Sequence, residues 1–147
     1  MRNNGIKPIA ARAILLATTI VLLVPGPVVE ATFDALSVLI PWLASNDGEP
    51  GLWTDKIIHL MLFLACGLSS ALAWQATARV MVGLLLYGAT TELLQGIIPG
   101  RGASIADFMA DALGAGLGIG FAVLASRSSP ATSQTEKRNS RDPHQRD

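Results

Sequence analysis

The sequence predicts an all-helical membrane protein in which four helices form a transmembrane bundle. Half of its 147 residues are hydrophobic and only 15% are charged, a balance that is unusually apolar for a soluble domain of this length. A hydrocarbon core about 30 Å thick requires roughly 20 mostly apolar residues per helix. The chain contains four such runs within one domain, residues 1–125, and we predict helices at about 9–29, 56–74, 78–98 and 104–125.

The first run, residues 9–29, shares some features with a secretory signal peptide. Arg2 and Lys7 precede it, as basic residues precede the apolar core of a signal. The apolar stretch is longer than a usual signal core, however, and no A-x-A site closes it. We therefore predict an uncleaved transmembrane helix.

The segment between the first two runs, residues 30–54, contains apolar side chains at near-helical spacing and two tryptophans. Such a pattern is typical of a helix that lies flat at a membrane surface, where tryptophan is enriched. We expect part of this segment to rest on the outer leaflet. The residues concerned are Phe33, Leu36, Ile40 and Leu43, with Trp42 and Trp53.

The short link between the second and third predicted helices, residues 75–77, lies on the same side of the bundle as both chain ends. This side carries nine of the eleven Lys and Arg residues, which leaves only Lys56 and Arg101 on the other side. By the positive-inside rule both termini are cytoplasmic. The nine residues are Arg2, Lys7, Arg12, Arg79, Arg127, Lys137, Arg138, Arg141 and Arg146.

The last predicted helix is followed by residues 126–147, which are rich in Ser, Thr, Arg and Pro and show no apolar periodicity. This composition predicts a disordered cytoplasmic tail. The single cysteine, Cys66, excludes an intramolecular disulfide and is expected to be a packing residue. The chain has no Walker glycine loop, paired-cysteine zinc pattern or nucleophile elbow, so familiar soluble enzyme classes and nucleic-acid partners receive no support.

Ionisable residues gather near the outer ends of the second, third and fourth predicted helices. In each helix two polar residues lie three or four positions apart, so they share one helix face. These faces continue into small residues such as Gly88, Gly114 and Gly118, as expected where helices pack closely in a membrane. The polar pairs are Asp55 with His59, Glu92 with Gln95, and Asp107 with Asp111.

The depth of these groups predicts one shared outer cavity. A rise of ~1.5 Å per residue places His59, Glu92 and Asp111 roughly 6 to 10 Å inside their helix ends. An isolated charge at such a depth costs at least ~2.5 to 3.5 kcal/mol, so the three groups are expected to meet one another or water. Two interpretations stay open, a functional site and a structural network whose members only satisfy one another.

Simpler roles also stay open for the flanking residues. Asp55 is suited to cap the second helix, and Ser104 with Asp107 fits a capping-box start for the fourth. Lys56 is long enough to extend to the membrane interface. Arg101 is either an ordinary loop charge or a clamp for an anionic head group.

A divalent metal ion is a further alternative for this cluster. One imidazole and several carboxylates, from His59, Glu92, Asp107 and Asp111, suit several divalent ions. The sequence shows no ligand spacing typical of a metal motif. We therefore predict no metal site and no cofactor.

Three short motifs follow one another across the last three predicted helices: D-K-x-x-H at 55–59, E-x-x-Q at 92–95 and R-x-x-S-x-x-D at 101–107. In this order they resemble the VanZ-like family of small bacterial membrane proteins, over about residues 53–120. The resemblance implies a multi-pass protein of the bacterial inner membrane with a role at the cell envelope. For the founding type that role is associated with reduced susceptibility to the glycopeptide teicoplanin. One departure is Asp111, where the family commonly has Asn, so this cluster has an extra carboxylate.

The sequence supports three functional hypotheses. The leading one is an envelope protein, non-catalytic or weakly catalytic, whose outer cavity binds an anionic lipid-linked or cell-wall precursor and affects teicoplanin susceptibility. The alternatives are a hydrolase or transferase that uses Glu92 or Asp111 with His59, and a small proton-coupled carrier. The candidate ligand-binding residues are Asp55, Lys56, His59, Glu92, Gln95, Arg101, Ser104, Asp107 and Asp111.

Overall fold

The computed structural model describes residues 5–39 and 52–128, and within these ranges the chain forms helices and connecting turns with no strand. This confirms the predicted all-helical fold. Ile40, Trp42, Leu43 and residues 129–147 of the predicted tail lie outside the described residues. The helices are α1 (Ile6–Leu22), α2 (Gly26–Leu39), α4 (Leu52–Trp74), α5 (Thr77–Gln95) and α6 (Ile105–Arg127).

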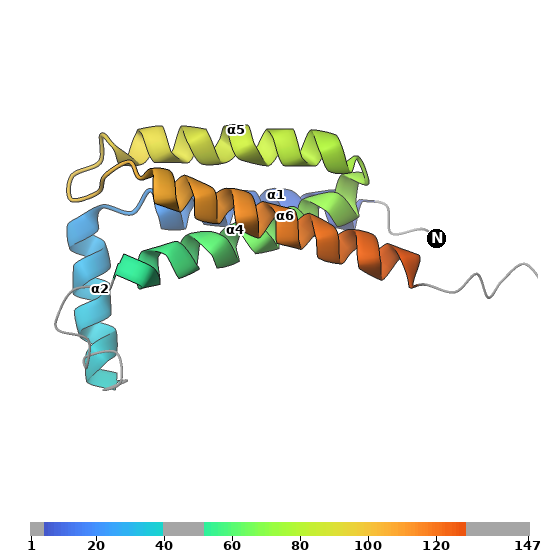
Figure 1. Cartoon of the computed structure of the whole chain (residues 1–147). Coiled ribbons are helices and arrows are strands. Elements are labelled where there is room, and N and C mark those ends of the chain that lie inside the picture. Colours follow the sequence, from blue (N-terminus) through green and yellow to red (C-terminus); the bar gives the residue numbers. More distant parts are fainter. Residues whose placement is uncertain (1–4, 40–51, 129–147) are drawn as a thin grey trace, which may run out of the picture.

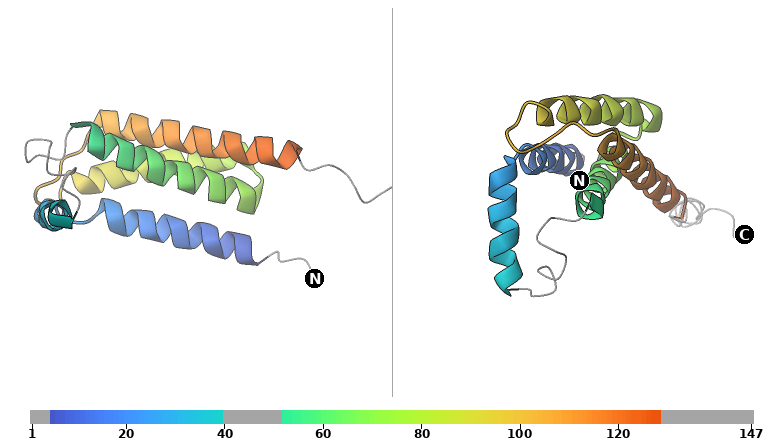
Figure 2. Two further views of the ribbon diagram at one scale, coloured as in Figure 1. Left: turned by 90° about the horizontal axis from the view of Figure 1, so that it is seen from below. Right: turned by 60° about the vertical axis from the view of Figure 1, so that its left-hand side comes forward.

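Four of the helices, α1, α4, α5 and α6, run alongside one another, while α2 crosses one end of them at a steep angle (Figures 1 and 2). We call this end, which holds the starts of α4 and α6 and the end of α5, the polar end. The opposite end holds the start of α1, the turn between α4 and α5, and the end of α6. We call it the basic end because Lys7, Arg79 and Arg127 lie there.

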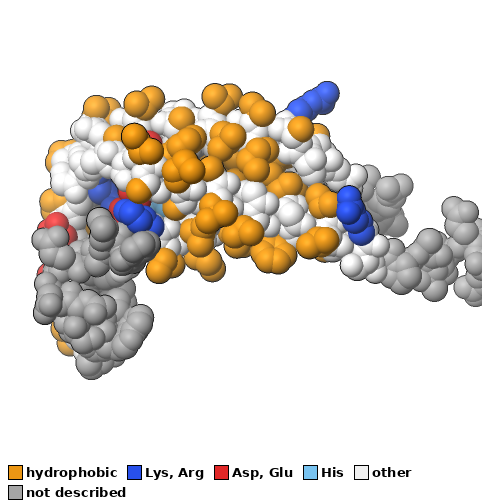
Figure 3. Space-filling model, viewed as in Figure 1, with side chains coloured by type: hydrophobic (Ala, Val, Ile, Leu, Met, Phe, Trp, Pro, Cys, Tyr) orange, Lys and Arg blue, Asp and Glu red, His pale blue; other side chains and the backbone are white. Residues whose placement is uncertain are grey.

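Two helices are long and apolar enough to cross a membrane, α4 from Thr54 to Trp74 and α6 from Ile105 to Arg127. A third span results if α1 and the start of α2 count as one, although they are bent by 95° at the break. On the face shown in Figure 3, hydrophobic side chains cover the flank, and charged side chains lie toward the two ends. Large apolar residues such as Leu93 (74%) and Leu86 (66%) are exposed, as expected of a surface that faces lipid.

The first helix differs from the prediction, which continued it to Val29. In the structure α1 ends at Leu22, and α2 begins at Gly26 in a new direction. Pro25 lies in the break, where its ring and its missing N–H prevent the helix from continuing. The apolar run is therefore divided between a helix of the bundle and α2, which includes the first part of the segment expected at the membrane surface.

The other three predicted helices are present with small changes at their ends. The structure begins the second helix at Leu52 rather than at residue 56, and it ends the third at Gln95 rather than at 98. The third helix gives way to a turn that contains Gly100, whose positive φ of 73° favours glycine. A Cβ on Gly100 would also lie 3.0 Å from Cδ of Pro27.

The closest packing joins α4 to α6 through small residues. A Cβ on Gly114 would collide with the backbone carbonyl of Leu60, and one on Gly118 with the carbonyl of Leu64. These glycines therefore let the two helix backbones approach directly, as their spacing predicts. Cys66 is fully buried, and its sulfur lies 3.3 Å from the hydroxyl of Thr18 on α1. This agrees with the packing role expected of the cysteine.

Candidate functional site

Three helices bring His59, Glu92 and Asp111 together inside the polar end, and we call these residues the central cluster. His59 of α4 and Asp111 of α6 are each 1% exposed, and Glu92 of α5 is 6% exposed. His59 Nδ1 lies 2.9 Å from Asp111 Oδ1 and 3.7 Å from Glu92 Oε1. The prediction of one shared location for the three groups from separate helices agrees with this geometry.

Small residues create the space that the central cluster occupies. Asp111 lies one turn before Gly114, where α4 and α6 come into backbone contact, so its side chain reaches His59 across a short gap. On α5, a Cβ at Gly88 would lie 3.2 Å from Asp111 Oδ2. A larger side chain at Gly88 would therefore press on the carboxylate. The glycine seams that the sequence shows on α5 and α6 position the cluster as well as the helices.

Glu92 also holds the start of α6. Its Oε2 accepts a 2.7 Å hydrogen bond from the backbone N–H of Ser104, the residue that caps α6. The Ser104 hydroxyl in turn accepts from the backbone N–H of Asp107 at 3.3 Å. The predicted capping box is thus half formed, because Glu92 of another helix takes the backbone N–H that the box would assign to Asp107.

Asp107 and Asp55 are instead paired with the two basic residues of this end. Lys56 Nζ lies 3.2 Å from Asp107 Oδ1, and Arg101 donates to Asp55 Oδ1 at 3.4 Å. The Lys56 and Arg101 side chains are 22% and 15% exposed, so both pairs are partly shielded from water. Lys56 therefore forms an ion pair rather than only extending to the interface. Each of the two basic residues of the polar end is paired with a carboxylate.

Gln95 has a different position from the one that its spacing suggests. Its side-chain amide donates to the backbone carbonyl of Leu22 at 2.9 Å, and Arg101 donates to the same carbonyl at 3.4 Å. Gln95 thus connects α5 to the end of α1, and no hydrogen bond between it and the central cluster is found in the described part of the chain. The Leu22 carbonyl has no sequence signal, because any residue supplies such a group.

Several buried polar atoms of the site have no hydrogen-bond partner among the described residues. They are Oε1 of Glu92, Oδ2 of Asp111 and Nε of Arg101. Most buried polar atoms in folded proteins are paired, and exceptions occur at sites that bind or react. A bound ligand or an ordered water supplies the partners of such atoms. The site therefore retains capacity to bind both a donor and an acceptor.

The geometry provides an oriented imidazole. When Nδ1 of His59 carries the proton, it donates to Asp111, and Nε2 is then a proton acceptor. A carboxylate that fixes one ring nitrogen and leaves the other for proton transfer is the arrangement that general base catalysis uses.

The donor set also has the composition of a cation site. Ligand atoms of His59, Glu92 and Asp111 lie within 4.8 Å of one another, and so do those of Asp55, His59 and Asp107. Oxygen and imidazole donors at this spacing fit a divalent ion such as Mn²⁺ or Zn²⁺. The sequence predicted no metal, and within residues 5–39 and 52–128 these two groups are the residues that could hold one.

The site contains more acidic than basic side chains. Four carboxylates face two basic side chains and one imidazole, so with all four ionised one negative charge is in excess even when the imidazole carries two protons. Such a surplus favours a proton or a cation beside any anionic ligand. The carboxylates are Asp55, Glu92, Asp107 and Asp111, and their partners are Lys56, Arg101 and His59.

Comparison with known proteins identifies a family that this chain matches. The sequence model of the family described as VanZ/LLP1 matches residues 8–126, a range that contains the whole polar end and nearly all of the described helices. No curated protein and no solved structure matches the chain.

Proposed function

Because the chain belongs to the VanZ/LLP1 family, a membership that its match over residues 8–126 shows, we propose that it is a bacterial inner-membrane protein that binds and chemically modifies the anionic head group of a lipid-linked or cell-wall precursor. The observation that carries this proposal is the His59–Asp111 hydrogen bond beside Oε1 of Glu92, which has no hydrogen-bond partner among the described residues. The catalytic alternative, a hydrolase or transferase, thereby moves ahead of simple binding.

The proposal includes a topology of four membrane spans with both termini in the cytoplasm. It counts α5 as a span beside α4 and α6, because α5 has 19 residues and packs against both of them. It counts α1 as a span that ends where α2 turns onto the membrane surface. The Lys and Arg residues of the basic end then face the cytoplasm, in accordance with the positive-inside rule, and the polar end faces outward.

Arg101 is the residue best suited to recognise an anion. Its two hydrogen bonds are long, at 3.4 Å each, and its buried Nε has no partner among the described residues. A guanidinium presents five donors in a planar fork that matches a phosphate or carboxylate. An anionic head group would therefore add to these contacts without first removing Asp55.

The central cluster supplies the chemistry. In the proposed reaction His59 takes a proton from water or from an acceptor hydroxyl, and the resulting oxygen nucleophile attacks the phosphorus or the ester carbon of the head group. The bond from that atom to the leaving oxygen then breaks, and the His59 imidazolium gives its proton to the leaving oxygen. Asp111 accepts the hydrogen bond from Nδ1 and so orients the imidazole. The carboxylate of Glu92, whose Oε1 lies 3.7 Å from Nδ1, stabilises the imidazolium that forms. The nucleophile comes from the substrate side, which agrees with the absence of a nucleophilic serine or cysteine among the residues of the cluster.

A test is to incubate purified full-length protein with lipid-linked precursors and to identify products by mass spectrometry. We expect a product that is lost in Glu92→Gln, which keeps the shape of the side chain, and retained in Glu30→Gln, a control at an exposed position of α2. Absence of product across lipid-linked phosphates, diphosphates and esters would reject catalysis.

Binding is tested separately through Arg101. Arg101→Gln is expected to weaken precursor binding and, where the envelope role extends to glycopeptides, to change teicoplanin susceptibility. Normal binding by this variant, at a normal membrane level, would reject the clamp. The proton-coupled carrier has no specific observation in its favour, because no series of ionisable side chains joins the polar end to the basic end in the described part of the chain.

A further inference from the structure

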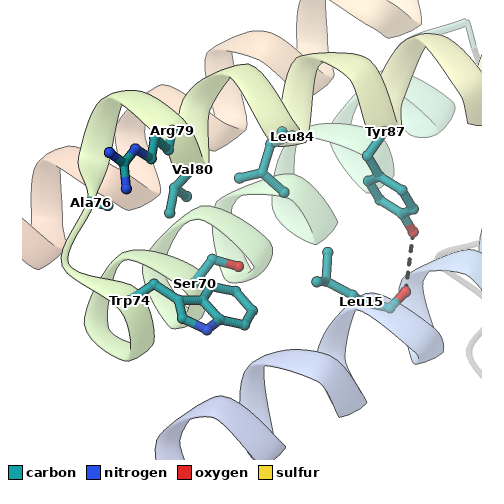
Figure 4. A pocket seen from close by; sticks show the side chains of 9 residues that line it. Leu15, Ser70, Trp74, Ala76, Arg79, Val80, Leu84 and Tyr87 are labelled. Carbon is teal, nitrogen blue, oxygen red and sulfur yellow. Dashed lines mark hydrogen bonds between the residues drawn. The ribbon is translucent and has the colours of Figure 1, made fainter.

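A cavity lies at the basic end, where Ser70 and Trp74 line it, about 27 to 33 Å along α4 from the start of that helix at a rise of ~1.5 Å per residue. Its volume is about 620 Å³, within the usual range of small-molecule sites. It is formed by α1, α4 and α5, and its walls are mostly apolar, with Leu15, Val80 and Leu84 among them (Figure 4). We call it the basic-end pocket.

The basic-end pocket is open beside Gly83, which lies on its α5 wall. A Cβ at Gly83 would have no atom within 4 Å, so the space beside it is open. The far wall is closed by Tyr87, whose hydroxyl donates to the carbonyl of Leu15 and lies 2.8 Å from the hydroxyl of Thr19. The Tyr87 hydroxyl therefore has its hydrogen bonds within the protein, and the pocket beside it is an apolar chamber.

The polar features of the pocket favour an anion. Among the described residues that line it, Arg79 is the only charged one. Arg79 lies in the first turn of α5, and Ala76, the residue that precedes this helix, provides no side-chain cap. The backbone N–H groups at a helix start attract negative charge. The guanidinium and the helix start thus both give a positive potential at the end of the pocket beside the turn between α4 and α5. We call this end the mouth of the pocket.

Ser70 is a second, independent feature of this pocket that points to a ligand. Ser70 lines the pocket and is 2% exposed, and its hydroxyl oxygen has no hydrogen-bond partner among the described residues. The neighbouring Ser69 donates to the carbonyl of Ala65, which shows the bond that a helical serine ordinarily makes. In Figure 4 the Ser70 hydroxyl points into the space between α4 and α5.

We propose that the basic-end pocket binds one anionic phospholipid, with an acyl chain along Leu15, Val80 and Leu84 and its phosphate at Arg79 and the first turn of α5. An apolar chamber with a cationic mouth matches a molecule that has both a hydrocarbon chain and a phosphate. Trp74, beside the mouth, is of the type that lies at the membrane interface, where a lipid phosphate is found. This site is separate from the central cluster and does not depend on its chemistry.

The test is native mass spectrometry of the full-length protein purified in detergent and mixed with equal amounts of phosphatidylglycerol and phosphatidylcholine of identical chains. We expect about fivefold more phosphatidylglycerol on the wild type, the size of effect that one partly exposed ion pair produces. Arg79→Gln should equalise the two lipids. Arg127→Gln, a matched change in the last turn of α6 away from the pocket, should leave the preference intact.

Filling the chamber tests the acyl chain. Gly83→Leu should lower retention of both lipids about fivefold or more, because the new side chain occupies the space of the chain. Gly120→Leu is the control, since a Cβ at Gly120 also has no atom within 4 Å but lies on α6 outside the lining. Undiminished binding by Gly83→Leu would overturn the proposal.

Two further measurements distinguish a lipid from a free anion and provide for a variant that does not fold. Displacement of the lipid by inorganic phosphate alone would show a plain anion site and overturn the lipid assignment. Failure of inorganic phosphate to compete supports it. Should Gly83→Leu not fold, Arg79→Gln decides, because this exposed residue is expected to be replaceable without loss of structure. A preference that survives Arg79→Gln would reject the proposed phosphate contact.

Discussion

The side-chain amide of Gln95 donates a 2.9 Å hydrogen bond to the backbone carbonyl of Leu22, and so joins the end of α5 to the last residue of α1. A carbonyl in the last turn of a helix has no partner within that helix. The partner here comes from a residue 3% exposed, next to the central cluster. The break between α1 and α2 is therefore fixed by the same end of α5 that supplies Glu92.

Replacing Gln95 with Ala is expected to lower the free energy of unfolding by about 1 to 3 kcal/mol, because the change leaves the buried Leu22 carbonyl with only its long bond to Arg101. The measurement is chemical unfolding in detergent micelles, followed by circular dichroism. Thr90→Ala is a suitable control, since the hydroxyl of Thr90 is exposed and bonds only within α5, to the carbonyl of Leu86. Equal stability of the two variants would contradict the role of Gln95.

The sequence predicts the helices well because apolar length and helical period are local properties. It predicts the meeting of His59, Glu92 and Asp111 because buried charges at similar depth need one another. It does not predict the partner of Gln95, since residue spacing gives the face of a helix and not the distance to a helix that is far away in the chain.

The sequence does not predict the helix break after Leu22 or the two ion pairs of the polar end, and the reasons are related. Residues 9–29 remain apolar through Pro25, so hydropathy alone continues the helix, whereas the proline ends it. The Lys56–Asp107 and Arg101–Asp55 pairs depend on the register between α4 and the start of α6. That register is fixed by three-dimensional packing at Gly114 and Gly118, which no local pattern specifies.

Gly118→Ala is expected to destabilise the protein by about 1 to 3 kcal/mol, because the added methyl group would collide with the backbone carbonyl of Leu64 and force α4 and α6 apart. Gly120→Ala is the matched control on the same helix, with no atom within 4 Å of the new Cβ. Thermal unfolding in the same detergent compares the two. A Gly118→Ala variant at least as stable as Gly120→Ala would show that the helices do not need this close approach.

Asp111→Asn is expected to keep the proposed activity within about tenfold of the wild type, whereas Asp111→Leu should lose about 100-fold or more. An asparagine oxygen still accepts the hydrogen bond from Nδ1 of His59 and keeps the ring oriented, while leucine has no acceptor. The resemblance to VanZ-like proteins, which commonly carry Asn here, agrees with this tolerance. Product formation at matched membrane levels is the measurement, and equal losses in both variants would mean that the charge of Asp111 is required.

A double-mutant cycle on Lys56 and Asp107 separates an ion pair from a ligand clamp. With side chains 22% and 7% exposed and 3.2 Å between Nζ and Oδ1, the pair is intermediate between a surface and a buried salt bridge, so we expect a coupling energy of about 1 to 2 kcal/mol. Lys56→Gln and Asp107→Asn should each destabilise the protein, and the double variant should lose less than the sum of the two.

The same four proteins are then compared for precursor binding, which the pair itself does not determine. If Lys56 serves only to neutralise Asp107, the double variant binds precursor as the wild type does, because the neutral pair leaves Arg101 and the central cluster in place. If Lys56 also contacts the head group, Lys56→Gln and the double variant share the same binding defect, and Asp107→Asn binds more tightly, since its lysine is released. We expect the first result, because Arg101 and not Lys56 has a buried donor without a partner among the described residues.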